Sequence, residues 1–172
     1  MARSQAVTDL RQTRGASMSA TTTGRYEVTT LRVRLRVQEP GGDPTETVRG
    51  PVDVVRIARA IYADLDADQE HFTVLALNTA NQVDGYKVVA SGAMDAAHVD
   101  PRLIFRAALY LGAAAIVLVH NHPSGSPEPS GDDLRITAKL DDAGKVVGMN
   151  VLDHVILGAG RFVSLRERGA FK

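Results

Sequence analysis

AAAIVLVHNHPSGSPEPSGDD, residues 113–133, joins an apolar run, two histidines and a polar loop rich in proline and glycine. The apolar run, residues 113–119, is short and uninterrupted, which is typical of a central strand covered on both faces. A helix-like pattern begins at Leu134. The stretch therefore predicts a buried strand, a loop and a helix in succession, with the histidines where the strand ends.

The two histidines and a later carboxylate have the spacing of a metal site. If the strand extends through His122, the side chains of His120 and His122 project from the same face. They then emerge at the carboxyl end of a strand, where open α/β sheets usually bind ligands. Ser130 is a favourable helix N-cap, and Asp133 is the third residue of that helix. Two imidazoles and one carboxylate suit Zn²⁺ and leave a fourth position for water, as a catalytic zinc site requires.

Each part of this pattern also has a plainer interpretation. Ser-x-x-Asp is an ordinary capping box, and loop histidines need not bind metal. Two histidines on one strand face make the metal interpretation stronger than either residue alone would. The letters His-Asn-His do not indicate an HNH nuclease, because in those enzymes the named residues are spread over a ββα-metal unit.

Length and composition restrict the classes of protein to consider. With 172 residues the chain is long enough for one well-buried core and short for two. It contains no cysteine, which excludes disulfides and thiolate ligands and fits a cytoplasmic location. Twenty basic and twenty acidic residues give zero formal charge, a poor profile for a nucleic-acid-binding protein. No apolar run reaches the length of a membrane span, so no membrane association is expected.

The first part of the chain differs in composition from the rest. Residues 1–24 are rich in Thr, Ser, Ala and Arg and have few large apolar side chains, which predicts a disordered tail. In residues 31–37 apolar side chains alternate with Arg32, Arg34 and Arg36, which predicts a half-buried strand. The arginine face is interpreted as a solvated edge, and a phosphate-binding stripe is the weaker alternative.

The remaining pattern alternates helices with strands. Helices are expected over residues 51–65, 101–111 and 134–143, the last ended by Gly144. Strands are expected over residues 72–77, 86–91, 113–119, 150–157 and 161–165. This order predicts a mixed sheet flanked by helices, a single α/β (α+β) domain over residues 25–172.

His120-x-His122, seven residues and Ser130-x-x-Asp133 resemble the JAMM motif of the JAB/MPN metalloprotease family. The flanking segments VDPRLIFRAALYLGAAAIVLV and VLDHVILGAGRFVSLRERG resemble its RadC-like branch, and the resemblance covers roughly residues 52–169. It implies an MPN/JAB-type domain with cytidine-deaminase-like topology. RadC-like proteins often carry a helix-hairpin-helix DNA-binding module, and nothing in residues 1–50 resembles one.

The same resemblance implies roles for individual residues. Zn²⁺ would be held by His120, His122 and Asp133. A glutamate ahead of an early buried strand would be the general base, and the matching position is Glu70; Glu128 is the rival, and a solvent-facing Glu70 is the plain alternative. Ser130 would help to hold the oxyanion, cap the helix, or do both. The pair Asp153-His154 is expected either to support the metal ligands or to be structural.

The leading hypothesis from the sequence is a zinc-dependent metallopeptidase or isopeptidase that acts on a peptide or protein substrate. The alternative is an accessory protein associated with DNA repair or mobile elements, with a structural or vestigial metal site, which the arginine stripe supports. A metal-free interaction module is a third interpretation, and the intact ligand set argues against it. The sequence leaves the substrate and the oligomeric state open.

Overall fold

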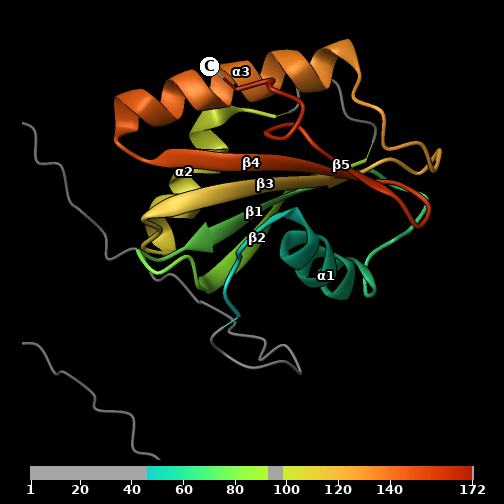
Figure 1. Cartoon of the computed structure of the whole chain (residues 1–172), viewed down its shortest axis with the longest axis horizontal. Coiled ribbons are helices and arrows are strands. Elements are labelled where there is room, and N and C mark those ends of the chain that lie inside the picture. Colours follow the sequence, from blue (N-terminus) through green and yellow to red (C-terminus); the bar gives the residue numbers. More distant parts are fainter. Residues whose placement is uncertain (1–45, 93–98, 172) are drawn as a thin grey trace, which may run out of the picture. The chain divides into compact units, whose positions relative to one another are not determined.

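Five strands form one mixed sheet in the order β2-β1-β3-β4-β5 (Figure 1). The strands are β1 His71–Leu77, β2 Val83–Ser91, β3 Ala115–Asn121, β4 Asn150–Leu157 and β5 Phe162–Ser164. β1 pairs antiparallel with β2 and β3, β3 pairs parallel with β4, and β4 pairs antiparallel with β5. This computed structural model describes residues 46–92 and 99–171, so the predicted tail 1–24 and the strand 31–37 with its arginines lie outside the described residues.

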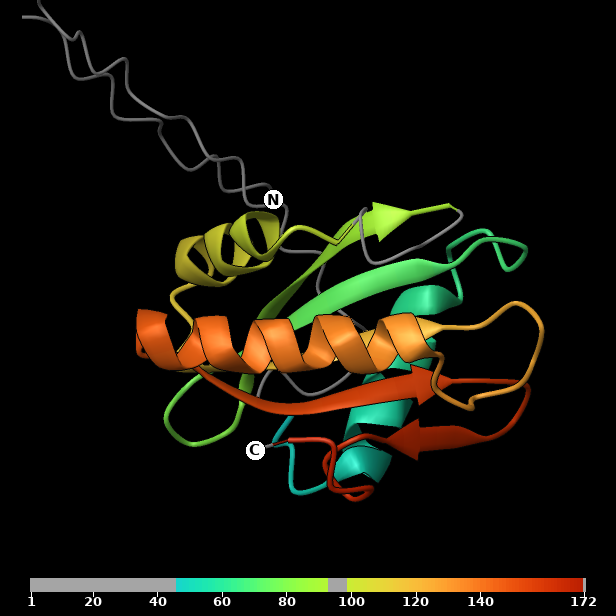
Figure 2. The same ribbon diagram turned by 90° about the horizontal axis from the view of Figure 1, so that it is seen from above.

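Helices cover both faces of the sheet (Figure 1). They are α1 Pro51–Tyr62, α2 Pro101–Tyr110 and α3 Gly131–Val147. Pro51 and Pro101 open their helices at the position where a missing N–H costs nothing. α3 connects the parallel strands β3 and β4 and runs lengthwise along the sheet (Figure 2). Among the described helices, none has both the length and the apolar character that a membrane crossing needs.

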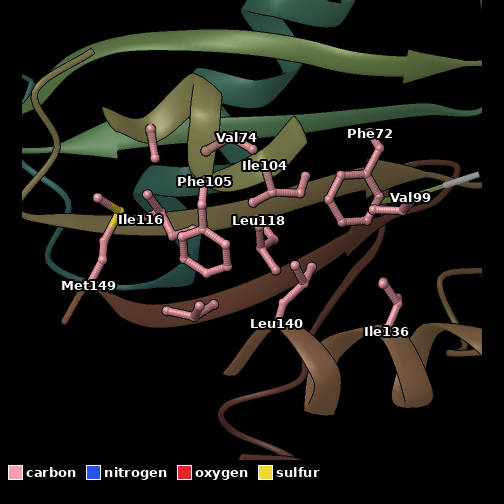
Figure 3. Close-up of a cluster of buried hydrophobic side chains, with 12 residues drawn as sticks. Phe72, Val74, Val99, Ile104, Phe105, Ile116, Leu118, Ile136, Leu140 and Met149 are labelled. Carbon is pink, nitrogen blue, oxygen red and sulfur yellow. The ribbon is translucent and has the colours of Figure 1, made fainter. Parts of the chain in front are cut away.

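Alternation along β1 and β3 divides the core between the two faces. Ile116 and Leu118 point toward α2 and α3, where they pack with Ile104, Phe105 and Leu140 (Figure 3). On the other face of the sheet, side chains of β1 and β3 pack against α1. They are Leu75 and Leu77 of β1 and Val117 and Val119 of β3, and they meet Val54, Ile57 and Ala58 of α1. β1 and β3 are therefore apolar on both faces, as expected for central strands.

The predicted fold class is confirmed: the domain is a mixed sheet flanked by helices. The predicted end of the third helix is wrong, because α3 continues past Gly144 to Val147 and ends at Gly148. Gly148 has the left-handed conformation of a C-cap, with φ of 77°. Gly144 has another role: a Cβ there would lie 2.5 Å from the backbone carbonyl oxygen of Met149, so the glycine permits close approach of the following chain.

Replacing Gly144 by alanine is expected to destabilise the domain, although alanine is the better helix former by about 1 kcal/mol. The added methyl group would meet fixed backbone, and overpacking of this kind costs about 1–3 kcal/mol. Thermal and denaturant unfolding would measure the loss. Gly131→Ala is the matched control, because the nearest atom to its Cβ would be the Arg135 side chain at 3.4 Å. Equal stability of the two variants would contradict the packing argument.

Candidate metal centre

β3 delivers two histidines to one point at its carboxyl end. The Nε2 atoms of His120 and His122 lie 2.9 Å apart. His122 follows the last residue of β3, but its N–H still donates to the carbonyl of Leu157, which extends the pairing with β4 by one step. That extra hydrogen bond continues the pairing with β4 at residue 122, and the two imidazoles converge at their Nε2 atoms.

The first turn of α3 adds a carboxylate to the two imidazoles. Asp133 Oδ1 lies 3.2 Å from Nε2 of His120, and Asp133 Oδ2 lies 3.5 Å from Nε2 of His122. Within the part of the chain that the structure describes, these three residues form a group that could hold a metal ion, with ligand atoms within 4.8 Å of one another. His120 is buried and the other two are half-buried, so the group opens to solvent on one side.

Ser130 is the N-cap of α3. Its hydroxyl accepts from the N–H of Asp133 and donates to Asp133 Oδ2, and its own N–H also donates to Oδ2. Asp133 therefore forms the capping box and also belongs to the group that could hold a metal ion. Its Oδ2 receives the capping bonds while both carboxylate oxygens face the imidazoles.

The ligand loop, residues 122–130, is held down by the turn that follows β4. The N–H of Ala159 donates to the carbonyl of Gly125, and a side chain at Gly158 would collide with that same carbonyl. Glu128 forms a bidentate pair with Arg168, with distances of 2.6 and 2.9 Å. The hydrogen bond with Arg168 lowers the pKa of the Glu128 carboxyl. Glu128, the other candidate for the general base, is thus exposed and paired with the guanidinium of Arg168.

Both imidazoles are oriented through their Nδ1 atoms. Nδ1 of His122 lies 2.7 Å from the carbonyl of Ser126, and Nδ1 of His120 lies 2.8 Å from Nε2 of His154. A carbonyl only accepts, so His122 donates from Nδ1 and, when neutral, presents a lone pair at Nε2. His154 is completely buried, and burial lowers its pKa well below the usual range of histidine.

The electrostatics of the cluster favour a cation. The hydrogen bond with Asp133 raises the pKa of His122, and the charge of Glu70 adds to the effect. Burial raises the pKa of Asp133, but its interactions with the imidazoles of His120 and His122 outweigh burial and hold that pKa well below its usual range. The site therefore stabilises positive charge at the point where the two Nε2 atoms and the carboxylate meet.

The residues fit a divalent metal. A tetrahedral site with bonds of 2.0–2.1 Å places its ligand atoms about 3.3 Å apart, close to the separations of 2.9, 3.2 and 3.5 Å found here. Nitrogen and carboxylate donors of this kind are those that Zn²⁺ accepts. The geometry supports a metal site, and the choice of metal rests on donor chemistry.

Glu70 directly precedes β1 and lies across from the second histidine. Phe72 pairs with His120 in the antiparallel ladder, so the same register puts residue 70 opposite residue 122, two steps beyond the last paired residues. Asn121, between the two histidines, holds this end of β1. Its Oδ1 accepts from the N–H of His71 at 2.8 Å, and its Nδ2 donates to the carbonyl of Gln69 at 2.9 Å. The two bonds fix the backbone on both sides of Glu70.

Two residues of the site were not singled out by the sequence. Asn121 lies between the two histidines of the motif, and Thr137 of α3 lies 2.6 Å from Nδ1 of His154. The sequence allows His154 either a supporting or a structural role. In the structure His154 pairs with Leu118 and lies on the same face of the sheet as His120.

Comparison with known proteins gives a consistent result. A family model described as RadC-like JAB domain matches residues 48–170. The chain is similar to a UPF0758 protein of Methanococcoides burtonii, with 42% identity over 127 residues, which is 74% of this chain and 55% of that protein. It is also similar to one of Listeria monocytogenes serovar 1/2a, with 46% identity over 124 residues, 72% of this chain and 54% of that protein. The chain spans about half the length of the curated relatives it matches.

Proposed function

Because the chain belongs to the RadC-like JAB domain family, we propose that it is a zinc metallohydrolase that cleaves a peptide or isopeptide bond. His120, His122 and Asp133 would hold the ion. One observation carries the proposal: two imidazole Nε2 atoms and a carboxylate converge on a single point. Each of these three side chains is also oriented by a further hydrogen bond, to His154, to the carbonyl of Ser126 and to Ser130. Ligands oriented in this way are the pattern of a metal site with outer-sphere support.

The reaction would be divided among a few side chains. Zinc, when bound, supplies a Lewis acid that makes water more acidic at neutral pH. Glu70, opposite His122, would take the proton from the attacking water and deliver it to the leaving nitrogen. Asn121 would keep the Glu70 backbone in place.

Ser130 and the start of α3 would stabilise negative charge on the substrate. The helix N-terminus presents N–H groups and the positive end of its dipole toward the cluster. The hydroxyl proton of Ser130 is bound to Asp133 Oδ2, so the oxyanion role requires that the hydroxyl turn toward the substrate. Helix capping by Ser130 needs no such change.

The proposal is tested by metal content and by hydrolysis together. Protein purified without chelator would be analysed for metals by mass spectrometry, and about one zinc per chain is expected. A peptide library from a whole-proteome digest would then be incubated with the protein in ¹⁸O-labelled water, which marks every new carboxyl terminus. Protein without stoichiometric metal would contradict the proposal. The nucleic-acid alternative stays a prediction, because the arginine stripe that supports it lies outside the described residues.

Replacing Asn121 by alanine is expected to lower hydrolysis of the labelled library roughly tenfold while zinc stays bound. The variant removes both hydrogen bonds that hold residues 69 and 71, and lost orientation of a reacting group commonly costs tenfold or more. Asn150→Ala is the control, since Asn150 is exposed at the opposite end of β4. An Asn121→Ala protein with full activity would show that Glu70 needs no such support.

A further inference from the structure

A chain of three hydrogen bonds runs through the core behind the candidate metal centre. The hydroxyl of Thr137 lies 2.6 Å from the carbonyl oxygen of Asp133 and 2.6 Å from Nδ1 of His154. Nε2 of His154 lies 2.8 Å from Nδ1 of His120. Thr137 and His154 are both 0% exposed, and His120 is 2% exposed. Water therefore has no access to these groups, and their protons must be shared among them alone.

The chemistry of the partners fixes the direction of every bond. A carbonyl oxygen only accepts, so the single hydroxyl proton of Thr137 goes to Asp133. The hydroxyl oxygen must then accept from Nδ1–H of His154. A neutral imidazole has a single proton, and the proton of His154 is on Nδ1, so none is left for its Nε2. Its Nε2 accepts, and His120 donates from Nδ1.

We propose that Thr137 and His154 are positioning residues, which fix the tautomer of His120 so that the lone pair of its Nε2 faces the metal. The opposite direction would put a proton on Nε2 of His120, between Nε2 of His122 at 2.9 Å and Oδ1 of Asp133 at 3.2 Å. A proton there would block the metal. The carbonyl oxygen of Asp133 excludes that direction, because it takes the only proton that Thr137 can give.

This chain of hydrogen bonds from Asp133 through Thr137 and His154 to His120, here called the relay, also links two of the proposed metal ligands to each other. It begins at the backbone of Asp133 in the first turn of α3 and ends at the side chain of His120 on β3. Correct docking of α3 on the sheet therefore sets the protonation pattern of a ligand on a different element. This inference rests on the proposed metal site, and it does not depend on the proposed reaction or its substrate.

The test compares Thr137→Val, which removes the hydroxyl at nearly constant shape, with Thr137→Ser, which keeps it. Zinc affinity would be measured by competition with a chromophoric chelator. Loss of an outer-sphere partner typically costs 10–100-fold in affinity, and a loss of roughly that size is expected for Thr137→Val. Thr137→Ser should restore affinity to near that of the parent protein. Thr73→Val makes the same chemical change at a buried threonine of β1, away from the relay, and should leave affinity unchanged.

A second measurement needs neither a variant nor metal. Nitrogen-15 spectra of histidine side chains distinguish the two neutral tautomers, and they would be recorded on metal-free parent protein at a pH where the imidazoles are neutral. The relay predicts a proton on Nδ1 of both His120 and His154. Protonated Nε2 on His120, or equal zinc affinity of Thr137→Val and Thr137→Ser, would overturn the inference. If the parent protein bound no zinc, the proposed function would be wrong. The tautomers of His120 and His154 would still show whether the relay has the proposed direction.

Discussion

A protein in which His120 and His122 are both alanine is expected to bind no stoichiometric zinc. The two imidazoles supply two of the three protein ligands, and the remaining carboxylate is already occupied by the helix cap. Structural zinc sites with four protein ligands are worth about 10–16 kcal/mol, which gives roughly 3 kcal/mol, or about a hundredfold in affinity, for one ligand. Losing both should weaken binding by about four orders of magnitude.

The measurement is zinc content after gel filtration, combined with chelator competition for the weaker variant. His71→Gln is the matched control, because His71 is buried beside the site yet bonds to Ser91 and to the carbonyl of Asp66. It should keep its zinc. Since buried His120 also bonds to His154, thermal unfolding should accompany the assay, and His122→Ala alone serves as the milder variant. A folded double variant that retained one zinc per chain would place the metal elsewhere.

Replacing Glu70 by glutamine is expected to reduce hydrolysis of the labelled peptide library by about 10²–10⁴-fold, the usual contribution of a general base. The amide has the size of the carboxylate but cannot take up a proton. Zinc content should not change, because Glu70 is not among the ligands that converge on the metal. Loss of activity with zinc retained is therefore the result that identifies the base.

Glu128→Gln is the informative control for this experiment, since Glu128 is the other candidate carboxylate. In the structure it is exposed and paired with Arg168, so its loss should loosen the ligand loop slightly and leave most of the activity. If Glu128→Gln were inactive and Glu70→Gln active, the assignment of the base would be reversed. If neither variant lost activity, proton transfer would not depend on either side chain.

The parts of the site that are close in sequence could be predicted from it. A short apolar strand, two histidines in alternating positions and a Ser-x-x-Asp helix start each follow local rules. The structure places His120, His122 and Asp133 together because strand geometry and a capped helix leave little freedom between them. The mixed sheet flanked by helices followed in the same way from the order of strand and helix patterns.

What depends on pairing between distant segments could not be predicted from these rules. The β1–β3 ladder puts Glu70 opposite His122, and only family resemblance indicated this residue. The link from Thr137 through His154 joins α3 to β4, and no local pattern records it. The prediction that the helix ends at Gly144 is wrong because this glycine is required by close packing with Met149, which follows the actual C-cap at Gly148.

The two hydrogen bonds from Asn121 to residues 69 and 71 have a consequence for the order in which the site forms during folding. The three ligands lie within one strand–loop–helix segment, so most of the metal site can form early through local contacts. Glu70, the proposed base, joins only when β1 pairs with β3, across a separation of 50 residues that is slower to close. Under the proposed function, the chain could therefore hold a metal before its base is in place, and hydrolytic capacity would appear last.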